Sequence, residues 1–272
     1  MTNLQVIPLL DYEVHGNVKL PMIVFLHGFL GSKIDWLPLI ECLKNDFYCI
    51  CFDLPGHGNS DKITLPVAGL IDCAEIILEN LESLGVVKFH LFGYSLGGRI
   101  ALHLARLAPE KLLSLQLESC HPGLLSVLDK LARQQNDKEW ADKLASLPIE
   151  SFLEFWYQQA VFEDLDEFER KQLIEMRSHN NSKALLNCYQ STSLAFQENL
   201  WFVPNELSQH DINCQLYVGS NDKKFFKLGC DWQRKAQINL LLIDNAGHNI
   251  HIAAPKKMAT EFIKSIIEPR PC

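Results

Sequence analysis

Hydrophobic positions along the chain fall into two alternating patterns. Short runs of apolar, β-branched and aromatic residues are typical of buried strands, and longer stretches with apolar residues near a 3.6-residue period are typical of helices. The six central strand-like runs are MIVFLH (22–27), FYCICFD (47–53), VVKFHLF (86–92), LLSLQLE (112–118), CQLYVG (214–219) and NLLLID (239–244). This alternation predicts an α/β fold, with a mostly parallel central sheet and helices on both faces. Residues 4–16 are expected to form an antiparallel hairpin at one edge.

A long segment without strand-like runs separates the fourth and fifth central strands, at about residues 121–206. Four stretches in this segment carry apolar residues near the helical period: KEWADKLASL, FLEFWYQQAVF, DEFERKQLIEMR and SKALLNCYQSTSLAF. We expect these helices to form an inserted lid over the carboxyl edge of the sheet. Residues 1–120 and 207–272 would then form the α/β core, as one domain of ordinary size.

Charge and cysteine content narrow the choice of partners and location. The formal net charge of −8 disfavours nucleic acid and anionic membranes as partners, since both attract basic surfaces. The nine cysteines are odd in number and form no C-x-x-C pair, so we expect reduced thiols and no metal site. No apolar stretch reaches the length of a membrane span, and the first thirty residues lack a leader pattern. We therefore expect a cytoplasmic protein without a cofactor, present as a monomer or weak homo-oligomer.

The sequence GYSLGGR at residues 93–99 carries the first candidate catalytic residue. It follows a strand-like run and opens a helical pattern, which is the context of a nucleophile elbow. Gly93 and Gly97 leave room for a sharp turn. Ser95 would then occupy a strained position at the start of the helix, where amide dipoles favour negative charge. We therefore predict that Ser95 carries the reactive hydroxyl.

A reactive serine needs a base, and the base needs an acid that fixes its tautomer. Asp222 follows the run CQLYVG, and His248 follows the run NLLLID. Both fall just beyond predicted parallel strands, at the edge where ligands bind in open α/β sheets. We therefore assign Ser95, Asp222 and His248 to a catalytic triad. Asp244 competes as the acid, and His251 competes as the base.

Backbone N–H groups in two turns are expected to complete the catalytic machinery. FLHGF (25–29) ends the first central strand, and Leu96 directly follows the predicted nucleophile. The N–H groups of Phe29 and Leu96 would form an oxyanion hole. His57, in the turn DLPGHGNS, is expected to be a hydrogen-bonded turn residue without a catalytic role.

The order of these motifs resembles the α/β-hydrolase superfamily over nearly the whole chain. HGF, DLPGHG, GYSLGG, the late aspartate and AGH follow one another in that order. Further stretches, several of them in the expected lid, are similar to the 2-succinyl-6-hydroxy-2,4-cyclohexadiene-1-carboxylate synthases of menaquinone biosynthesis. They are HPGL (121–124), WYQQ (156–159), MRSHNN (176–181), TSL (192–194), NDKKF (221–225) and AGHN (246–249). The chain departs from the familiar pattern at ESC (118–120), which stands in place of a glycine-rich pair.

The resemblance implies a lyase reaction on a hydrolase scaffold. The family eliminates pyruvate from 2-succinyl-5-enolpyruvyl-6-hydroxy-3-cyclohexene-1-carboxylate, a small anionic tricarboxylate. Arginine suits such a substrate because its planar fork pairs with carboxylates. The arginines that match the substrate-binding positions of the family are Arg99, Arg133 and Arg177, and the aromatic residues that match its pocket lining are Trp156 and Tyr157.

Taken without the resemblance, these side chains have plainer interpretations. Arg99 lies four residues after Ser95 and would be a packing or salt-bridge residue, while arginines and aromatic residues of a lid usually face solvent or core. Tyr94 would either donate a hydrogen bond to a substrate carboxylate or wedge the elbow. We expect Ser95 to act as a base on the ring proton alpha to the succinyl ketone.

Two other functions fit parts of the pattern. A serine carboxylesterase or a carbon–carbon bond hydrolase would use the same triad and oxyanion hole, but a neutral ester pocket has no use for three arginines. A non-catalytic member of the fold would bind a ligand in the lidded pocket, but a pure binding protein has no need of a complete triad.

Overall fold

The computed structural model describes residues 8–267, which include a seven-stranded sheet in the order β1-β3-β2-β4-β5-β6-β7. The strands are β1 (Tyr12–His15), β2 (Met22–Leu26), β3 (Tyr48–Phe52), β4 (Phe89–Tyr94), β5 (Leu112–Glu118), β6 (Asn213–Gly219) and β7 (Asn239–Ile243). Strands β2 to β7 run parallel to one another, and β1 pairs antiparallel with β3. The predicted α/β class with a mostly parallel sheet is confirmed.

Two of the predicted strands differ from the structure in detail. Strand β4 begins at Phe89, three residues later than predicted, because a turn at Leu84 and Gly85, where Gly85 has a positive φ of 71°, is followed by three residues outside the sheet. The edge hairpin predicted at 4–16 is wrong within the described residues. Strand β1 pairs with β3 and has no second strand beside it in residues 8–11. Residues 4–7 of that prediction lie outside the described range.

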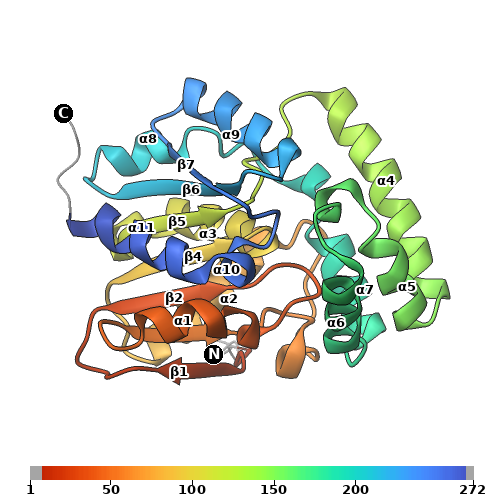
Figure 1. Cartoon of the computed structure of the whole chain (residues 1–272), viewed down its shortest axis with the longest axis horizontal. Coiled ribbons are helices and arrows are strands. Elements are labelled where there is room, and N and C mark those ends of the chain that lie inside the picture. The colour runs from red at the N-terminus through yellow and green to blue at the C-terminus, as the bar shows by residue number, and fades with distance from the viewer. Residues whose placement is uncertain (1–7, 268–272) are drawn as a thin grey trace, which may run out of the picture.

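Helices cover both faces of the sheet (Figure 1). Outside the segment between β5 and β6, they are α1 (Leu37–Leu43), α2 (Leu70–Ser83), α3 (Leu96–Leu107), α9 (Lys223–Lys235), α10 (Ile250–Ala253) and α11 (Pro255–Ile267). Strand β2 shows how alternation builds two cores: Val24 and Leu26 pack with residues of α2, α3 and α9, whereas Ile23 and Phe25 pack with α1, α10 and α11. The sheet is therefore buried on both sides, as parallel sheets are.

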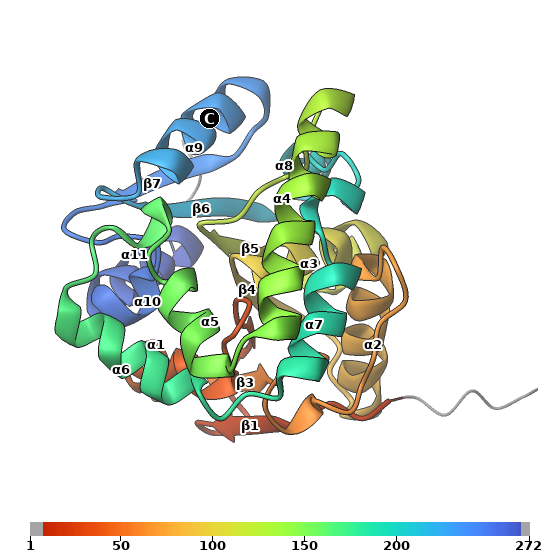
Figure 2. The same cartoon turned by 90° about the vertical axis from the view of Figure 1, so that its right-hand side faces the viewer.

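Five helices lie between β5 and β6. They are α4 (Val127–Ser146), α5 (Ile149–Trp156), α6 (Glu167–Arg177), α7 (Ser182–Ser191) and α8 (Val203–Ser208). Helices α4 to α7 gather beyond one end of the sheet, and Figure 2 views the molecule from their side. Their apolar residues form a third core, which includes Leu30 from the turn after β2. The predicted helical character is confirmed, while the division into a core and a lid at residues 121 and 206 stays a prediction.

The cysteines and the helices bear on the expected environment of the protein. The eight cysteines within residues 8–267 form no disulfide with one another, and Cys272 lies outside this range. Burial raises the pKa of Cys49 and of Cys51 to about 12, so both are poor nucleophiles at neutral pH. No helix in the described part of the chain is both long and apolar enough to cross a membrane.

Candidate active site

Ser95 lies in a strained turn between β4 and α3. Its φ of 49° and ψ of −105° are unfavourable for a residue with a side chain. The turn is held by the Ser95 N–H, which donates to the Glu118 backbone carbonyl at 2.9 Å. A side chain at Gly97 would place its Cβ 2.1 Å from the Leu26 carbonyl oxygen, so only glycine fits there. The predicted elbow geometry at Ser95 is present.

Asp222 and His248 form a buried pair at the same edge of the sheet. The distance from His248 Nδ1 to Asp222 Oδ2 is 2.7 Å, and the second carboxylate oxygen accepts from the Phe225 N–H at 3.0 Å. An ionised carboxylate can only accept, so Nδ1 carries the proton and Nε2 is left as the basic nitrogen. The His248 ring lies 5.3 Å from the ring of Tyr94, the residue before Ser95. The structure thus brings the three predicted triad residues to one region.

The competing acid and base occupy other environments. Asp244 is exposed just beyond β7. His251 is buried and pairs with Glu118, whose Oε1 lies 2.8 Å from His251 Nδ1. The same Oε1 accepts from the backbone N–H groups of Ile250 at 2.6 Å and of His251 at 3.2 Å. Glu118 therefore holds the segment that follows His248, while its backbone holds Ser95.

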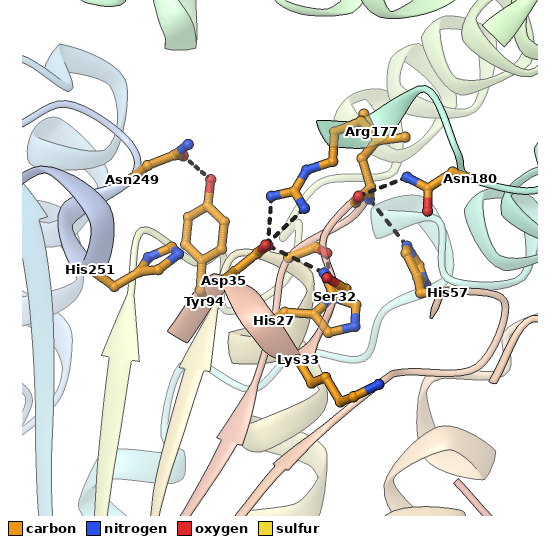
Figure 3. Close-up of polar contacts among 12 residues, drawn as sticks. His27, Ser32, Lys33, Asp35, His57, Tyr94, Arg177, Asn180, Asn249 and His251 are labelled. Carbon is orange, nitrogen blue, oxygen red and sulfur yellow. Dashed lines mark hydrogen bonds and ion pairs between the residues drawn. The ribbon is translucent and has the colours of Figure 1, made fainter. Parts of the chain in front are cut away.

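The turn after β2 is fixed by two buried histidines. His27 Nε2 accepts from the Leu54 N–H at 3.0 Å. His57 Nε2 accepts from the Leu30 N–H at 3.1 Å (Figure 3). Burial lowers the pKa of His57 to about 3, so the ring is neutral and able to accept. His57 thus has the structural contacts expected of a turn residue.

The two predicted oxyanion-hole groups lie in turns that these contacts fix. Within residues 8–267, the N–H groups of Phe29 and Leu96 donate to no other protein group. Leu96 also begins α3, where the unpaired amides of the first turn favour negative charge. Both N–H groups are therefore free to stabilise an oxyanion, and this role stays a prediction.

Tyr94 is packed as a wedge beneath the elbow. A Cβ on Gly28 would lie 2.5 Å from Tyr94 Cε1, so the ring presses on the turn that carries Phe29. The Tyr94 hydroxyl donates to Asn249 Oδ1 (Figure 3). Of the two interpretations of Tyr94, the structure shows contacts of the wedge, and a hydrogen bond to substrate stays a prediction.

Arg99 is a cation without a carboxylate partner among the described residues. Its Nε donates to Gln197 Oε1 at 2.6 Å, and its Nη2 donates to the Thr192 carbonyl at 2.5 Å. Burial and the positive charge of Arg133 lower the pKa of Arg99 to about 9, and the guanidinium stays charged at neutral pH. An arginine held by neutral acceptors in this way keeps most of its charge for an anionic ligand.

Arg133 is oriented by a buried acidic residue on its own helix. Its Nε lies 2.6 Å from Asp137 Oδ1, and the same carboxylate accepts from the Tyr189 hydroxyl at 2.9 Å and from Ser193 Oγ at 2.5 Å. The side chain of Arg133 is still 30% exposed, so it can contact a ligand.

Arg177 lies in a different environment. Its Nη1 and Nη2 donate to the two carboxylate oxygens of Asp35, each at 2.7 Å (Figure 3). The side chain is 6% exposed, and it also bonds to Tyr157. Both ends of its fork are therefore occupied, and a contact with substrate stays a prediction.

The two predicted pocket aromatic residues differ in what they touch. The half-buried Trp156 lies 5.2 Å from the Phe29 ring, so it stands beside the predicted oxyanion turn. Tyr157 is buried against Phe162 and Arg177. Their assignment to the pocket lining is not tested by these contacts and stays a prediction. The described residues contain no group of three side chains able to hold a metal ion.

Comparison with known proteins decides the family. A family model described as the alpha/beta hydrolase fold matches residues 21–255. A 2-succinyl-6-hydroxy-2,4-cyclohexadiene-1-carboxylate synthase of Enterobacter sp. is 38% identical over 244 residues, which cover 90% of this chain and 91% of the relative. The chain belongs to this synthase family. A second synthase, of Photorhabdus laumondii, is 39% identical over 89% of this chain and 84% of its own.

Two solved structures are similar in architecture to this chain. MenH from S. aureus has a TM-score of 0.83 at 25% identity and covers 94% of this chain and 97% of its own. A thaumarchaeal carboxylesterase has a TM-score of 0.76 at 20% identity and covers 93% and 92%. This second likeness shows the α/β-hydrolase fold alone. The fold expected from the motif order is therefore confirmed, and so is the family.

Several residues that hold the site were missed from the sequence. Glu118, Gln197 and Asn249 contact predicted site residues or their neighbours from positions distant in sequence, whereas Asp137 lies four residues after Arg133 on α4. Two of these had a usable signal: Glu118 ends a predicted parallel strand at the edge where ligands bind, and Asp137 has the helical i,i+4 spacing from Arg133.

Proposed function

We propose that this protein eliminates pyruvate from 2-succinyl-5-enolpyruvyl-6-hydroxy-3-cyclohexene-1-carboxylate, giving 2-succinyl-6-hydroxy-2,4-cyclohexadiene-1-carboxylate in menaquinone biosynthesis. The observation that carries the proposal is Arg99, held one helical turn beyond Ser95 without a carboxylate partner in residues 8–267. An esterase pocket for neutral substrates gains nothing from such a charge, whereas a tricarboxylate needs it. The relatives at 38% and 39% identity are named as synthases of 2-succinyl-6-hydroxy-2,4-cyclohexadiene-1-carboxylate, which agrees with an anionic substrate.

The proposed reaction begins with a proton transfer. His248, oriented by Asp222, takes the hydroxyl proton of Ser95, and the serine oxygen removes the ring proton alpha to the succinyl ketone. The electron pair of that C–H bond forms an enolate, whose oxygen accepts from the N–H groups of Phe29 and Leu96. The contact of His248 Nδ1 with Asp222 supports this step, because it leaves Nε2 as the nitrogen that can accept the serine proton.

The second step breaks a carbon–oxygen bond. As the enolate collapses, its electron pair forms a double bond between C2 and C3, the existing ring double bond shifts from C3–C4 to C4–C5, and the enolpyruvyl group leaves C5 with the C–O electrons. The proton held by His248 goes to the departing enolate of pyruvate, which becomes pyruvate. No water enters the reaction and no acyl-enzyme forms. Arg99 and Arg133 would hold carboxylates of the substrate, which is a small molecule met in the cytoplasm.

The test is pyruvate release from the enolpyruvyl substrate by the wild-type protein and by Ser95→Ala. We expect rapid release by the wild type and a loss of at least about a hundredfold in kcat for the variant, because the proton acceptor is gone. Binding of the substrate by Ser95→Ala should be nearly unchanged. Substantial elimination by Ser95→Ala would refute the proposed role of the serine. Hydrolysis of p-nitrophenyl acetate without pyruvate release would favour an esterase.

A further inference from the structure

Lys224 carries a charge close to the acid–histidine pair. It is the second residue of α9, two positions after Asp222, whose side chain caps that helix. Its Nζ lies 5.5 Å from the centroid of the Phe225 ring, and the Phe225 ring lies 4.9 Å from the His248 ring. The ammonium group of Lys224 therefore lies beside an aromatic ring that itself contacts the catalytic histidine candidate.

The neighbouring lysine shows what an ordinary surface lysine does here. Lys223 Nζ pairs with Glu163 Oε1 at 3.0 Å, and its side chain is 85% exposed. Lys224 forms no ion pair with any carboxylate in residues 8–267. The side chain of Lys224 is also exposed, so its charge is unpaired and open to a ligand.

Other cations surround the same space. Partial desolvation by neighbouring atoms and, after it, the positive charge of Arg133 lower the pKa of Lys224. Burial and the charges of Arg99, Lys224 and Arg133 also lower the pKa of His121 to about 3. Helices α3, α4 and α9 thus each bring a cation near His121. Like charges gathered in this way repel one another unless an anion lies between them.

The proposed substrate has three carboxylates, but both terminal nitrogens of the Arg177 guanidinium already donate to Asp35. We propose that Lys224 binds one substrate carboxylate together with Arg133, so that the third substrate-binding cation comes from α9. This assignment rests on the proposed function, which supplies the identity of the anion. In it, Lys224 determines specificity for a substrate with several negative charges.

The test compares Lys224→Met with the matched control Lys223→Met. Each removes one ammonium from the same turn of α9. We expect Lys224→Met to raise the KM for the enolpyruvyl substrate by about tenfold, as for the loss of one charge-assisted hydrogen bond. Lys223→Met should leave the KM unchanged, and Lys224→Arg should recover most of the affinity. Thermal unfolding of the variants checks that each is folded.

Citrate, a simple tricarboxylate, separates this proposal from the proposed function. Its binding to the wild type and to both variants is measured by calorimetry. If the wild type releases no pyruvate but Lys224→Met alone weakens citrate binding, the anion site stands and the proposed reaction falls. If pyruvate is released and Lys224→Met behaves like Lys223→Met in both assays, Lys224 does not bind the substrate. If neither activity nor citrate binding is found, both proposals fail.

Discussion

Arg177 and Asp35 form a buried bidentate ion pair that joins helix α6 to the turn after β2. The two N–O distances are 2.7 Å, and both side chains are at most 6% exposed. Burial alone would lower the pKa of Arg177, but the negative charge of Asp35 and the hydrogen bonds that Arg177 donates to Asp35 and Tyr157 raise it above its usual value. The pair therefore fixes helix α6 to the segment that follows Phe29.

Breaking this pair should cost stability more than affinity. Arg177→Met leaves a buried carboxylate without its partner, so we expect the free energy of unfolding to fall by about 3 kcal/mol. Asp35→Asn should cost a similar amount, and the double variant should cost less than the sum of the two. Urea unfolding of the four proteins measures this coupling. Additive losses, together with a large rise in KM for Arg177→Met, would instead place Arg177 on the substrate.

Glu118 should control the reactivity of Ser95 without binding substrate. Its carboxylate holds the segment after His248, and its carbonyl holds the Ser95 N–H. Glu118→Gln keeps the size but replaces one acceptor by a donor, so the segment carrying His248 should shift. We expect kcat to fall by about tenfold with little change in KM.

A second measurement separates this effect from a general loss of folding. The rate at which a fluorophosphonate labels Ser95 should fall by the same factor in Glu118→Gln, because it depends on the same histidine. Glu110→Gln, at an exposed position just beyond the C-terminal end of α3, is the matched control and should change neither rate. Equal kcat and labelling rates in Glu118→Gln and the wild type would contradict the positioning role.

The strands and the triad could be predicted because their signals are local. Each parallel strand is a short apolar run, nearly all buried in β4 and β6 and partly exposed in the edge strand β7, and Ser95, Asp222 and His248 each follow such a run. Parallel strands end at one edge, so residues that follow them meet in space. The family motifs in the lid then indicated the anionic substrate.

The contacts that orient these residues could not be predicted. Arg99 reaches Gln197, and Arg177 reaches Asp35, which is 142 residues away in the chain. Nothing in the local pattern of a lid helix distinguishes an arginine that pairs with a buried aspartate from one that faces a ligand. The edge strand β1 was predicted as half of a hairpin for a related reason. Its partner is β3, which is distant in the sequence, and not the residues that flank it.

Ser119 should weaken the fold where the familiar pattern has glycine. It is fully buried with a φ of 45°, a conformation that costs a residue with a side chain about 1 kcal/mol. Its hydroxyl is buried and has no hydrogen-bond partner within the described residues. Ser119→Gly removes both penalties, while the added freedom of the unfolded chain offsets part of the gain.

We therefore expect Ser119→Gly to raise the free energy of unfolding by about 1 kcal/mol. Ser119→Ala removes the unpaired hydroxyl but keeps the unfavourable φ, so its stability should lie between those of the wild type and the glycine variant. Thermal and urea unfolding of the three proteins give this order. A glycine variant less stable than the wild type would show that the hydroxyl or the backbone of Ser119 is stabilised by its surroundings. Because Ser119 follows Glu118, which holds the triad, pyruvate release should be measured on the same samples to show whether the strain at this turn serves activity.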